Sequence, residues 1–236
     1  MTQAPDATTR GLLDRRGRRG LVLGALTLLT LIGLLFWAAG RVDWIRGWAA
    51  VGAFVAGHLA NRLTLLRRHP ELLNRRGQRV PRGTKSWDRR LMAVALPMPF
   101  LIPVVAGLDA GRHGHELGWS WYVAGAVPFV LGVILGIAAM VHNAHFEKTV
   151  RLQEGHHVVD SGPYSRVRHP GYVASALVFG AAPLLLGSAL ALIPAGLFVA
   201  LFVLRTARED RTLRSELEGY QAYAQRVRWR LVPGLW

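Results

Sequence analysis

Residues 20–40 read GLVLGALTLLTLIGLLFWAAG and carry no charged side chain. A helix of about 20 apolar residues is long enough to cross the hydrocarbon core of a bilayer. Further apolar runs occupy residues 44–66, 91–108 and 119–142, and a longer run occupies residues 171–204. The sequence therefore predicts an all-α integral membrane protein with four clear transmembrane helices.

The run 171–204 is too long for one spanning helix and barely long enough for two. Pro183 and the pair Gly187–Ser188 lie near its middle and favour a turn there. We expect a helical hairpin, formed either by two tight spans or by a re-entrant pair.

Positive charge is distributed unevenly along the chain. The formal net charge is +15, and most of the 29 Lys and Arg residues fall on one side of the membrane if the spans alternate. This is the positive-inside bias, so we expect both termini to be cytoplasmic in a bacterial-type inner or plasma membrane. Topology and attraction to anionic lipid headgroups explain the basicity better than nucleic-acid binding, which we do not expect.

Three regions are expected along the chain. Residues 1–19 are typical of a flexible basic tail, residues 20–139 form an N-terminal transmembrane region, and residues 140–236 hold the polar chemistry. The first apolar run exceeds the usual signal-peptide core and is followed by further spans, so we expect no cleavage. The segment 67–90 is interpreted as a basic cytoplasmic loop whose charged face lies against headgroups.

Polar residues gather after the fourth span. His142, His145, Glu147 and His156 lie close together in sequence, but their spacing matches no metal-binding pattern, and we expect no metal site. A strand-like segment at 157–160 then leads into a cationic loop, SGPYSRVRHPGY, at 161–172. Two prolines prevent this loop from continuing a helix.

A cytoplasmic amphipathic helix is expected at 205–228, because apolar residues recur there at three- and four-residue steps. The same face contains Arg205 and Glu209 at the point where the helix leaves the apolar hairpin. An ionisable pair at a membrane boundary is costly, which favours a functional role. Arg208 and Asp210 are expected to face headgroups. The segment 227–236 either folds back against the loop or anchors at the interface.

Four motifs together resemble the isoprenylcysteine carboxyl methyltransferase family. They are Gly162-Pro163-Tyr164-x-x-Val167-Arg168-His169-Pro170-x-Tyr172, Arg205-x-x-x-Glu209-Asp210, Gly219-Tyr220-x-x-Tyr223 and Arg230-Leu231-x-Pro233-Gly234. Their order and spacing are similar to the family's over about residues 140–236. The Arg-His-Pro-x-Tyr element also resembles the wider group of integral-membrane methyltransferases.

The resemblance implies an S-adenosylmethionine-dependent methyltransferase without a Rossmann domain, acting on a lipophilic small-molecule or prenylated acceptor at the cytoplasmic membrane face. It places the catalytic contact to the acceptor carboxylate at Arg205. It places donor contacts at Gln153, His156, His157, Val158, Val159, Tyr164, His169, Pro170, Gly171, Tyr172 and Glu209. A carboxylate acceptor is already ionised at neutral pH, so such a reaction needs no general base.

Other functions stay open at this point. A lipid amine or a thiol is an alternative acceptor on the same scaffold, and an amine would need a base such as His145 or Glu147. An NADPH-dependent membrane reductase resembling the sterol reductases has a similar Tyr-x-x-Tyr…Pro-Gly ending. A channel or scaffold is disfavoured, because the spans carry too few polar residues for an ion path.

Overall fold

Helices account for 73% of the computed structural model, which describes residues 13–77, 83–152 and 155–236. No strand forms in these ranges, so the predicted all-α class without a Rossmann-type sheet is confirmed. The expected strand-like segment 157–160 is irregular instead, because no second strand lies beside it to complete a ladder.

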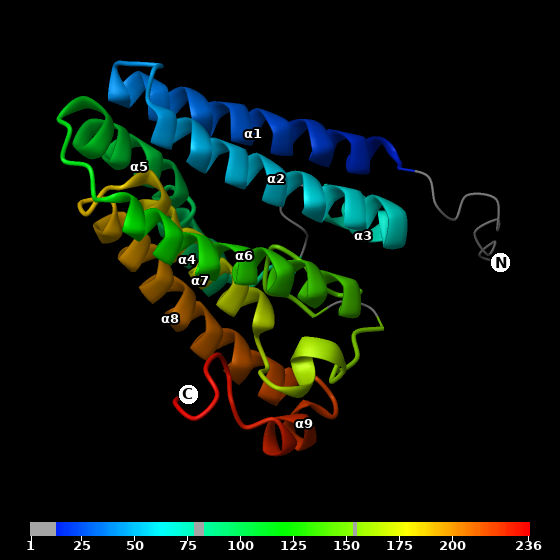
Figure 1. Cartoon of the computed structure of the whole chain (residues 1–236). Coiled ribbons are helices and arrows are strands. Elements are labelled where there is room, and N and C mark those ends of the chain that lie inside the picture. Colours follow the sequence, from blue (N-terminus) through cyan, green and yellow to red (C-terminus); the bar gives the residue numbers. More distant parts are fainter. Residues whose placement is uncertain (1–12, 78–82, 153–154) are drawn as a thin grey trace.

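Four helical segments are long and apolar enough to span a membrane, as the sequence predicts. They are α1 (Arg15–Ala39), α2 (Ile45–Arg68), the composite Ser86–Arg112 and α6 (Trp119–His142) (Figure 1). The composite consists of α4 (Ser86–Ala95), α5 (Met98–Ala106) and a π-helical turn η2 (Gly107–Arg112). Pro97 lies at the junction of α4 and α5, where its missing N–H interrupts the helical hydrogen bonding.

The outward faces of these helices are apolar. Leu29 of α1 is 62% exposed, and Val123 and Ile134, which lie on one face of α6, are 65% and 59% exposed. A soluble protein of this size rarely exposes so much large apolar surface, whereas a bilayer covers it. The surface therefore agrees with the membrane assignment made from helix length.

The hairpin is present, and its turn lies where the sequence predicts it. Helix α7 (Pro170–Leu186) ends at Gly187, which adopts a left-handed φ of +76°, and α8 (Leu192–Glu216) returns along it. The predicted separate helix at 205–228 is wrong, because α8 continues through Arg205 without a break. It ends at Glu216, and Gly219 with φ +76° turns the chain into the short α9 (Tyr220–Arg226).

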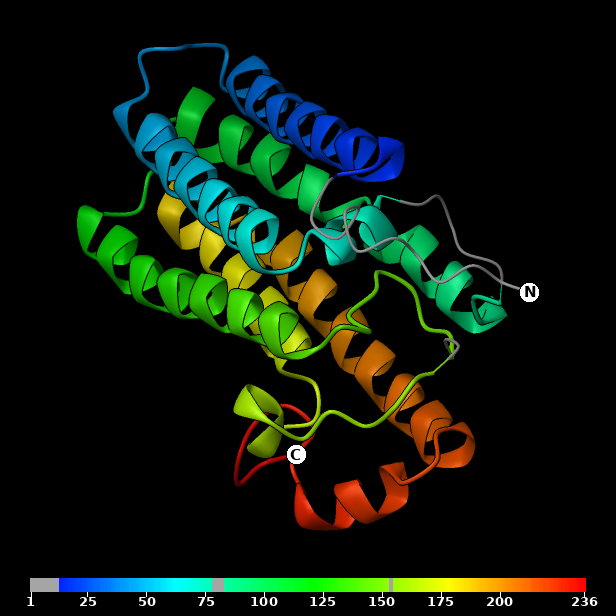
Figure 2. The same cartoon turned by 90° about the vertical axis from the view of Figure 1, so that its right-hand side faces the viewer.

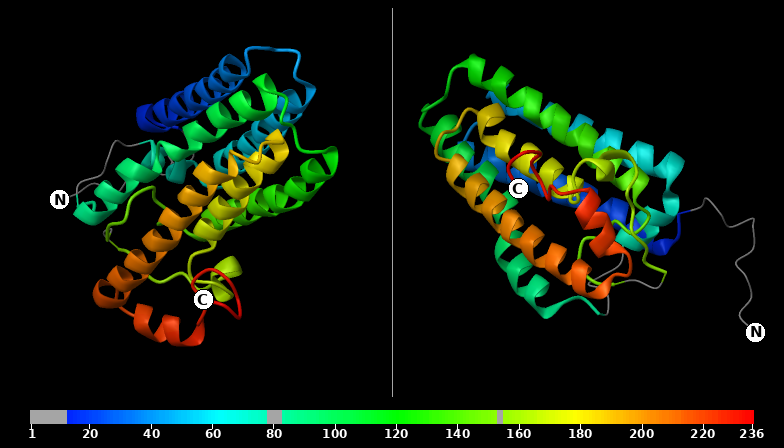
Figure 3. Two further views of the ribbon diagram at one scale, coloured as in Figure 1. Left: turned by 90° about the vertical axis from the view of Figure 1, so that its left-hand side faces the viewer. Right: turned by 90° about the horizontal axis from the view of Figure 1, so that it is seen from below.

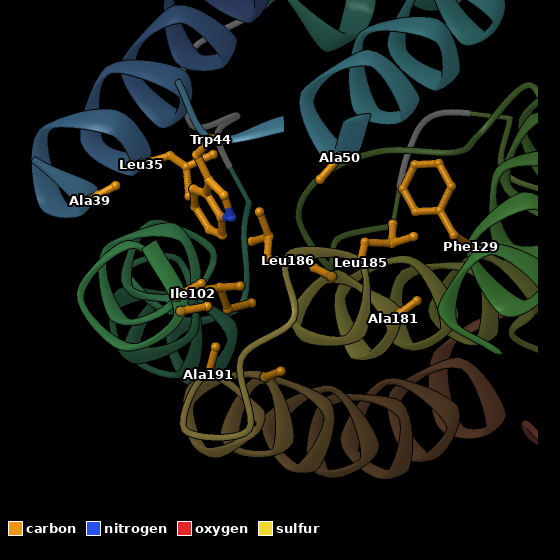
Figure 4. Packing of buried hydrophobic residues seen from close by; sticks show 14 of the residues in the cluster. Leu35, Ala39, Trp44, Ala50, Ile102, Phe129, Ala181, Leu185, Leu186 and Ala191 are labelled. Carbon is orange, nitrogen blue, oxygen red and sulfur yellow. The ribbon is translucent and has the colours of Figure 1, made fainter. Parts of the chain in front are cut away.

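The helices pack around a common core in an order that differs from their order in the chain. Helix α1 packs on α5, α5 on α8, α8 on α7, α7 on α6, and α6 on α2 (Figures 1 and 2). Helices α6 and α7 approach closely at Gly132, where an added Cβ atom would lie 3.0 Å from the carbonyl oxygen of Ala174. The short helix α3 (Pro70–Arg76) packs on α1. A buried apolar cluster fills the centre and includes Leu35, Trp44, Ile102, Phe129 and Leu185 (Figure 4).

Arg46 closes the end of the bundle near the hairpin turn. The sequence places it near an exposed loop, but its side chain is 1% exposed. Its Nε donates to the carbonyl oxygen of Leu185 at 3.0 Å, and its Nη2 donates to that of Leu184 at 2.6 Å. These carbonyls belong to the last turn of α7, where helix carbonyls lack their usual intrahelical partners, and Leu184 accepts in addition from the backbone N–H of Gly187 at 3.2 Å. Arg46 therefore caps α7 from a neighbouring helix.

Replacing Arg46 by Ala should destabilise the protein by about 2–4 kcal/mol, because the Leu185 carbonyl loses the donation from Nε and the Leu184 carbonyl loses one of its two donors. The thermal unfolding midpoint in detergent measures this. Arg41→Ala is the matched control, because Arg41 pairs only with the exposed Asp43. Equal midpoints for the two variants would show that Arg46 does not stabilise the hairpin.

Candidate active site

A cavity lies at the end of the bundle where α6, α8 and the loop before α7 meet α9 (Figure 2). Its wall comes from residues 143–152 and 156–159, the 3₁₀ turn η3 (Gly162–Ser165), residues 168–172 at the start of α7, the second half of α8, and α9. Nine of the residues that the sequence assigns to the donor site line this cavity: His156, His157, Val158, Val159, Tyr164, His169, Gly171, Tyr172 and Glu209. The fold thus brings together segments that are far apart in sequence.

Two assigned residues that the structure describes, Pro170 and Arg205, do not line the cavity. Pro170 is the buried first residue of α7 and lies behind the wall. Arg205 lies beneath the cavity and is also buried. Gln153 lies outside the described residues.

Two buried polar atoms in the residues of the cavity wall have no hydrogen-bond partner in the part of the chain that the structure describes. They are Nδ1 of His156 and Oγ1 of Thr149. An unpaired buried polar atom is costly, and native proteins pair almost all of them. The wall therefore offers hydrogen bonds that a polar ligand would complete. Sequence analysis missed Thr149.

His156 is held in its neutral form. Its pKa is lowered to about 4, mainly by burial and also by the neighbouring His145 and His157. The His145 ring stacks on that of His156 with centroids 4.7 Å apart, and His145 Nε2 lies 3.3 Å from Nδ1 of His157. At neutral pH, His156 therefore offers one donor and one acceptor nitrogen to the cavity.

Acid should destabilise the protein partly through His156. In the unfolded chain, His156 has a pKa near 6.5 and binds a proton below it, whereas the folded protein keeps the ring neutral. The free energy of unfolding therefore decreases as pH falls from about 6.5 towards 4. We expect about 1–2 kcal/mol after allowing for solvent screening of this half-buried group. Unfolding midpoints at pH 7 and pH 5 should therefore differ more for wild type than for His156→Asn. An equal pH difference in both proteins would contradict this assignment.

Glu209 presents a carboxylate to the cavity from α8. The hydroxyl of Tyr172, on α7, donates a short hydrogen bond to Glu209 Oε2. The Tyr172 ring stacks near His169, with centroids 5.7 Å apart. The hydrogen bond fixes the carboxylate and leaves its other oxygen able to accept from a cationic ligand group.

Arg205 forms a buried ion pair with Asp88 from α4. Its Nε lies 2.8 Å from Oδ1 and its Nη2 lies 3.1 Å from Oδ2, and Asp88 is 0% exposed. Nη2 also donates to the carbonyl oxygen of Lys148 at 2.8 Å, and the backbone N–H of Val150 donates to Asp88. Two of the three guanidinium nitrogens are thus occupied, and the pair joins α4, α8 and the cavity loop.

Asp88 corrects the interpretation of 67–90 as a solvated loop. It lies in the first turn of α4, on the buried stripe that continues through Leu91 and Ala95. That three- and four-residue spacing is the signal that could have found it. Its partner Arg205 is 117 residues away in the chain, so no local pattern identifies the pair.

Asp210 anchors the cationic loop and is not a headgroup-facing residue as predicted. Its side chain is 1% exposed, and Arg168 binds it with two nitrogens, at 2.7 and 3.2 Å. Arg214, Arg230 and the hydroxyl of Tyr220 complete its shell at 3.1, 2.9 and 3.1 Å. A buried carboxylate with several donors is the usual form of a stable buried charge.

The C-terminal segment folds back onto the cationic loop (Figure 3). The backbone N–H groups of Arg168 and His169 donate to the carbonyls of Trp229 and Arg230 at 2.9 and 3.0 Å. Arg168 also donates to the carbonyl of Val227 at 2.6 Å. These contacts settle the two alternatives for 227–236 in favour of folding back, and they fix His169 at the cavity.

The family comparison covers the helices that carry this site. Residues 124–215 match the isoprenylcysteine carboxyl methyltransferase (ICMT) family. The ICMT match includes most of α6, the cavity loop, α7 and nearly all of α8, and it confirms the family suspected from the motifs, of which the first two lie within the matched residues. No curated protein matches the chain. With the four apolar helices, the match supports a membrane methyltransferase of the ICMT family.

Proposed function

We propose that the protein transfers a methyl group from S-adenosylmethionine to a lipophilic acceptor at the cytoplasmic face of a bacterial-type inner or plasma membrane. The observation that carries this proposal is the pair of unpaired buried atoms, His156 Nδ1 and Thr149 Oγ1, in the wall of a cavity lined by the expected donor-site residues. The ICMT match supports the reaction class.

The cavity fits the chemical groups of S-adenosylmethionine. Glu209 would accept hydrogen bonds from the amino group, which is a charge-assisted contact. The N-terminus of α7 at Gly171 would attract the carboxylate. Neutral His156 and Thr149 would hydrogen-bond the uncharged polar atoms. When bound, this cofactor supplies a methyl group on a positively charged sulfur.

The residues around the donor would act by positioning and by excluding water. Methyl transfer from a sulfonium destroys charge, so a dry, aligned site favours it over bulk water. The aromatic rings of Tyr172 and Tyr164 form part of the cavity wall. The hydrogen bonds of Asp210 and the folded-back C-terminal segment hold the loop that carries His169.

Arg205 is proposed to orient the acceptor from beneath Tyr172, whose ring centroid lies 5.3 Å from the guanidinium carbon. Its bonds to Asp88 occupy Nε and Nη2, which leaves Nη1 for an acceptor oxygen. Arg205→Ala should lower acceptor turnover about 100-fold while the Kd of the donor changes little. Arg205→Lys keeps the positive charge, lacks the planar guanidinium with its paired N–H donors, and serves as the matched variant.

Steady-state kinetics with the acceptor varied, together with donor titration, separate the two possible effects of Arg205→Ala. Unchanged turnover of every tested acceptor would show that Arg205 does not orient the acceptor. Equal losses of donor binding and turnover would show that its ion pair with Asp88 is purely structural.

Transfer of labelled methyl groups tests the proposed reaction itself. Purified protein in nanodiscs would be supplied with S-adenosylmethionine carrying a labelled methyl, and with a prenylated carboxylate, a phospholipid amine or a lipophilic thiol. Label in one lipid product is the expected result. Absence of label from every acceptor, in a preparation that oxidises NADPH with a sterol-like substrate, would favour the reductase alternative.

A further inference from the structure

A second cavity opens between α1, α2, α6 and α7, on the bundle side next to the candidate active site. Small residues line much of it, including Gly20, Gly24, Gly57, Gly132 and Gly136. Helices α1 and α2 are consecutive in the chain, yet α1 packs mainly on α3 and α5, which leaves this groove between them. Because glycines line the groove along this membrane-spanning part of the fold, no large side chains fill it at these positions.

Three cations gather at one end of the groove: Arg62 of α2, Arg76 of α3, and Lys148 of the loop after α6. None of them forms an ion pair with a carboxylate in the described ranges. The neighbouring Glu147 binds Arg151 instead, with two bonds of 2.6 and 2.7 Å. The cluster therefore presents three positive charges beside an apolar groove, and the only carboxylate found to act on Arg76 in the described ranges, Glu147, is bound to Arg151.

The three charges repel one another. The pKa of Arg76 is lowered to about 10, mainly by burial and then by the charge of Arg62, while Glu147 acts in the opposite direction. The pKa of Lys148 is lowered by burial and then by Arg76 and Arg62. Neighbouring cationic groups whose pKa values are lowered by burial and by one another are typical of a site that binds an anion.

Contacts fix the positions of these side chains. A Cβ at Gly24 would lie 2.8 Å from Nη2 of Arg62, so the glycine allows the guanidinium to lie against α1. Nη1 of Arg76 donates to the carbonyl of Phe146 at 3.4 Å. The Lys148 carbonyl accepts from Arg205, which holds this part of the loop at the groove.

The opposite end of the groove is apolar and continues into the bundle. An adjoining cavity shares Leu28, Leu31, Phe54 and Phe179 with it and is lined only by apolar side chains. A ligand that fits both ends therefore needs a negative head and a long apolar chain. At the charged end, Phe146 and Gly171 line both the groove and the candidate active-site cavity, so the head lies next to the proposed donor site.

We propose that the groove binds a lipid whose headgroup carries a phosphate, with the phosphate among Arg62, Arg76 and Lys148 and the chain between α1, α2, α6 and α7. A phosphate group has more oxygens than a carboxylate, so it can accept hydrogen bonds from all three cationic side chains better than a single carboxylate can. This inference rests on the proposed function, for which it names a phosphate-bearing lipid as the lipophilic acceptor. Its head group reaches the donor cavity past Phe146.

Lipid binding in the absence of a methyl donor tests this site. The full-length protein in detergent would be titrated with dioleoyl phosphatidic acid, with dioleoylglycerol as the neutral lipid of equal chains, and with oleate as the carboxylate. Retained lipid would be measured by native mass spectrometry. Glycerol phosphate, which lacks the chains, distinguishes a lipid site from a free-phosphate site.

Two charge-neutralised variants of equal net charge provide the control. Arg62→Gln/Arg76→Gln/Lys148→Gln removes the cluster, and Arg67→Gln/Arg68→Gln/Arg75→Gln removes three cations from the same end of α2 and α3. Lys148→Glu alone is a third variant, and because the Lys148 side chain lines the open groove and forms no ion pair in the described ranges, this change should leave folding intact.

Phosphatidic acid should bind about tenfold or more tightly than dioleoylglycerol and oleate, and the cluster variant and Lys148→Glu should lose that preference. The control variant should keep it. Equal binding of the three lipids, equal losses in both triple variants, or tight binding of glycerol phosphate alone would each overturn the proposal. Donor titration on the same samples reports separately on the proposed function, because it requires no lipid.

Discussion

Replacing Glu209 by Gln should weaken S-adenosylmethionine binding by about 10–100-fold, equivalent to about 1.4–2.8 kcal/mol. The substitution keeps the size of the side chain and removes its charge, so the amino group of the donor loses a charge-assisted contact. Isothermal titration with purified protein in detergent measures the Kd. Glu218→Gln is the matched control, because Glu218 is an exposed acid just after α8.

Tyr172→Phe provides a second test of the same contact. It removes the hydroxyl that donates to Glu209 and should weaken donor binding by less than Glu209→Gln does, because the charge remains. Unaltered donor affinity in Glu209→Gln, with wild-type binding intact, would place the amino group of the donor elsewhere in the cavity.

Replacing Asp210 by Asn should have the largest effect on stability, about 3–5 kcal/mol, because it leaves Arg168 buried without its counter-charge. Arg214 and Arg230 are more exposed and contribute less. Because the same carboxylate holds the loop that carries His169, donor binding should also fall. Thermal unfolding in detergent measures the first effect and donor titration the second.

Asp160→Asn is the control for Asp210, since Asp160 pairs with Arg226 on the surface, where the side chains are 55% and 64% exposed. Its unfolding midpoint should stay close to that of wild type. A midpoint for Asp210→Asn that matched this control would mean that the buried network adds nothing to stability.

Local sequence patterns predicted the elements well where one apolar run makes one helix. The spans at 20–40, 44–66 and 119–142 agree with α1, α2 and α6, and the hairpin turn at Gly187 agrees with its left-handed φ. The end of the hairpin was harder to predict. Helix α8 continues from the apolar part into the polar part without a break, because polar residues such as Arg205 do not end a helix when a partner neutralises them.

The candidate site was predictable only in part. The motif resemblance identified nine lining residues of the cavity, of which the cationic loop and α8 carry five and the segment 156–159 just before the loop carries four. The roles of Asp88 and Asp210 depend on partners 117 and 42 residues away, and pairing over such distances follows from packing and not from local pattern. The groove cations Arg62, Arg76 and Lys148 come from three separate segments for the same reason.

The central claim is that the cavity between α6, α8 and the loop before α7 binds a methyl donor. Titration of S-adenosylmethionine into the folded wild-type protein, followed by the same titration into His156→Asn, tests it most directly. The account predicts saturable wild-type binding that weakens when His156 loses its ring nitrogens. An absence of wild-type binding in a sample that unfolds cooperatively would contradict it, and saturable binding of NADPH by that sample would point to the reductase function instead.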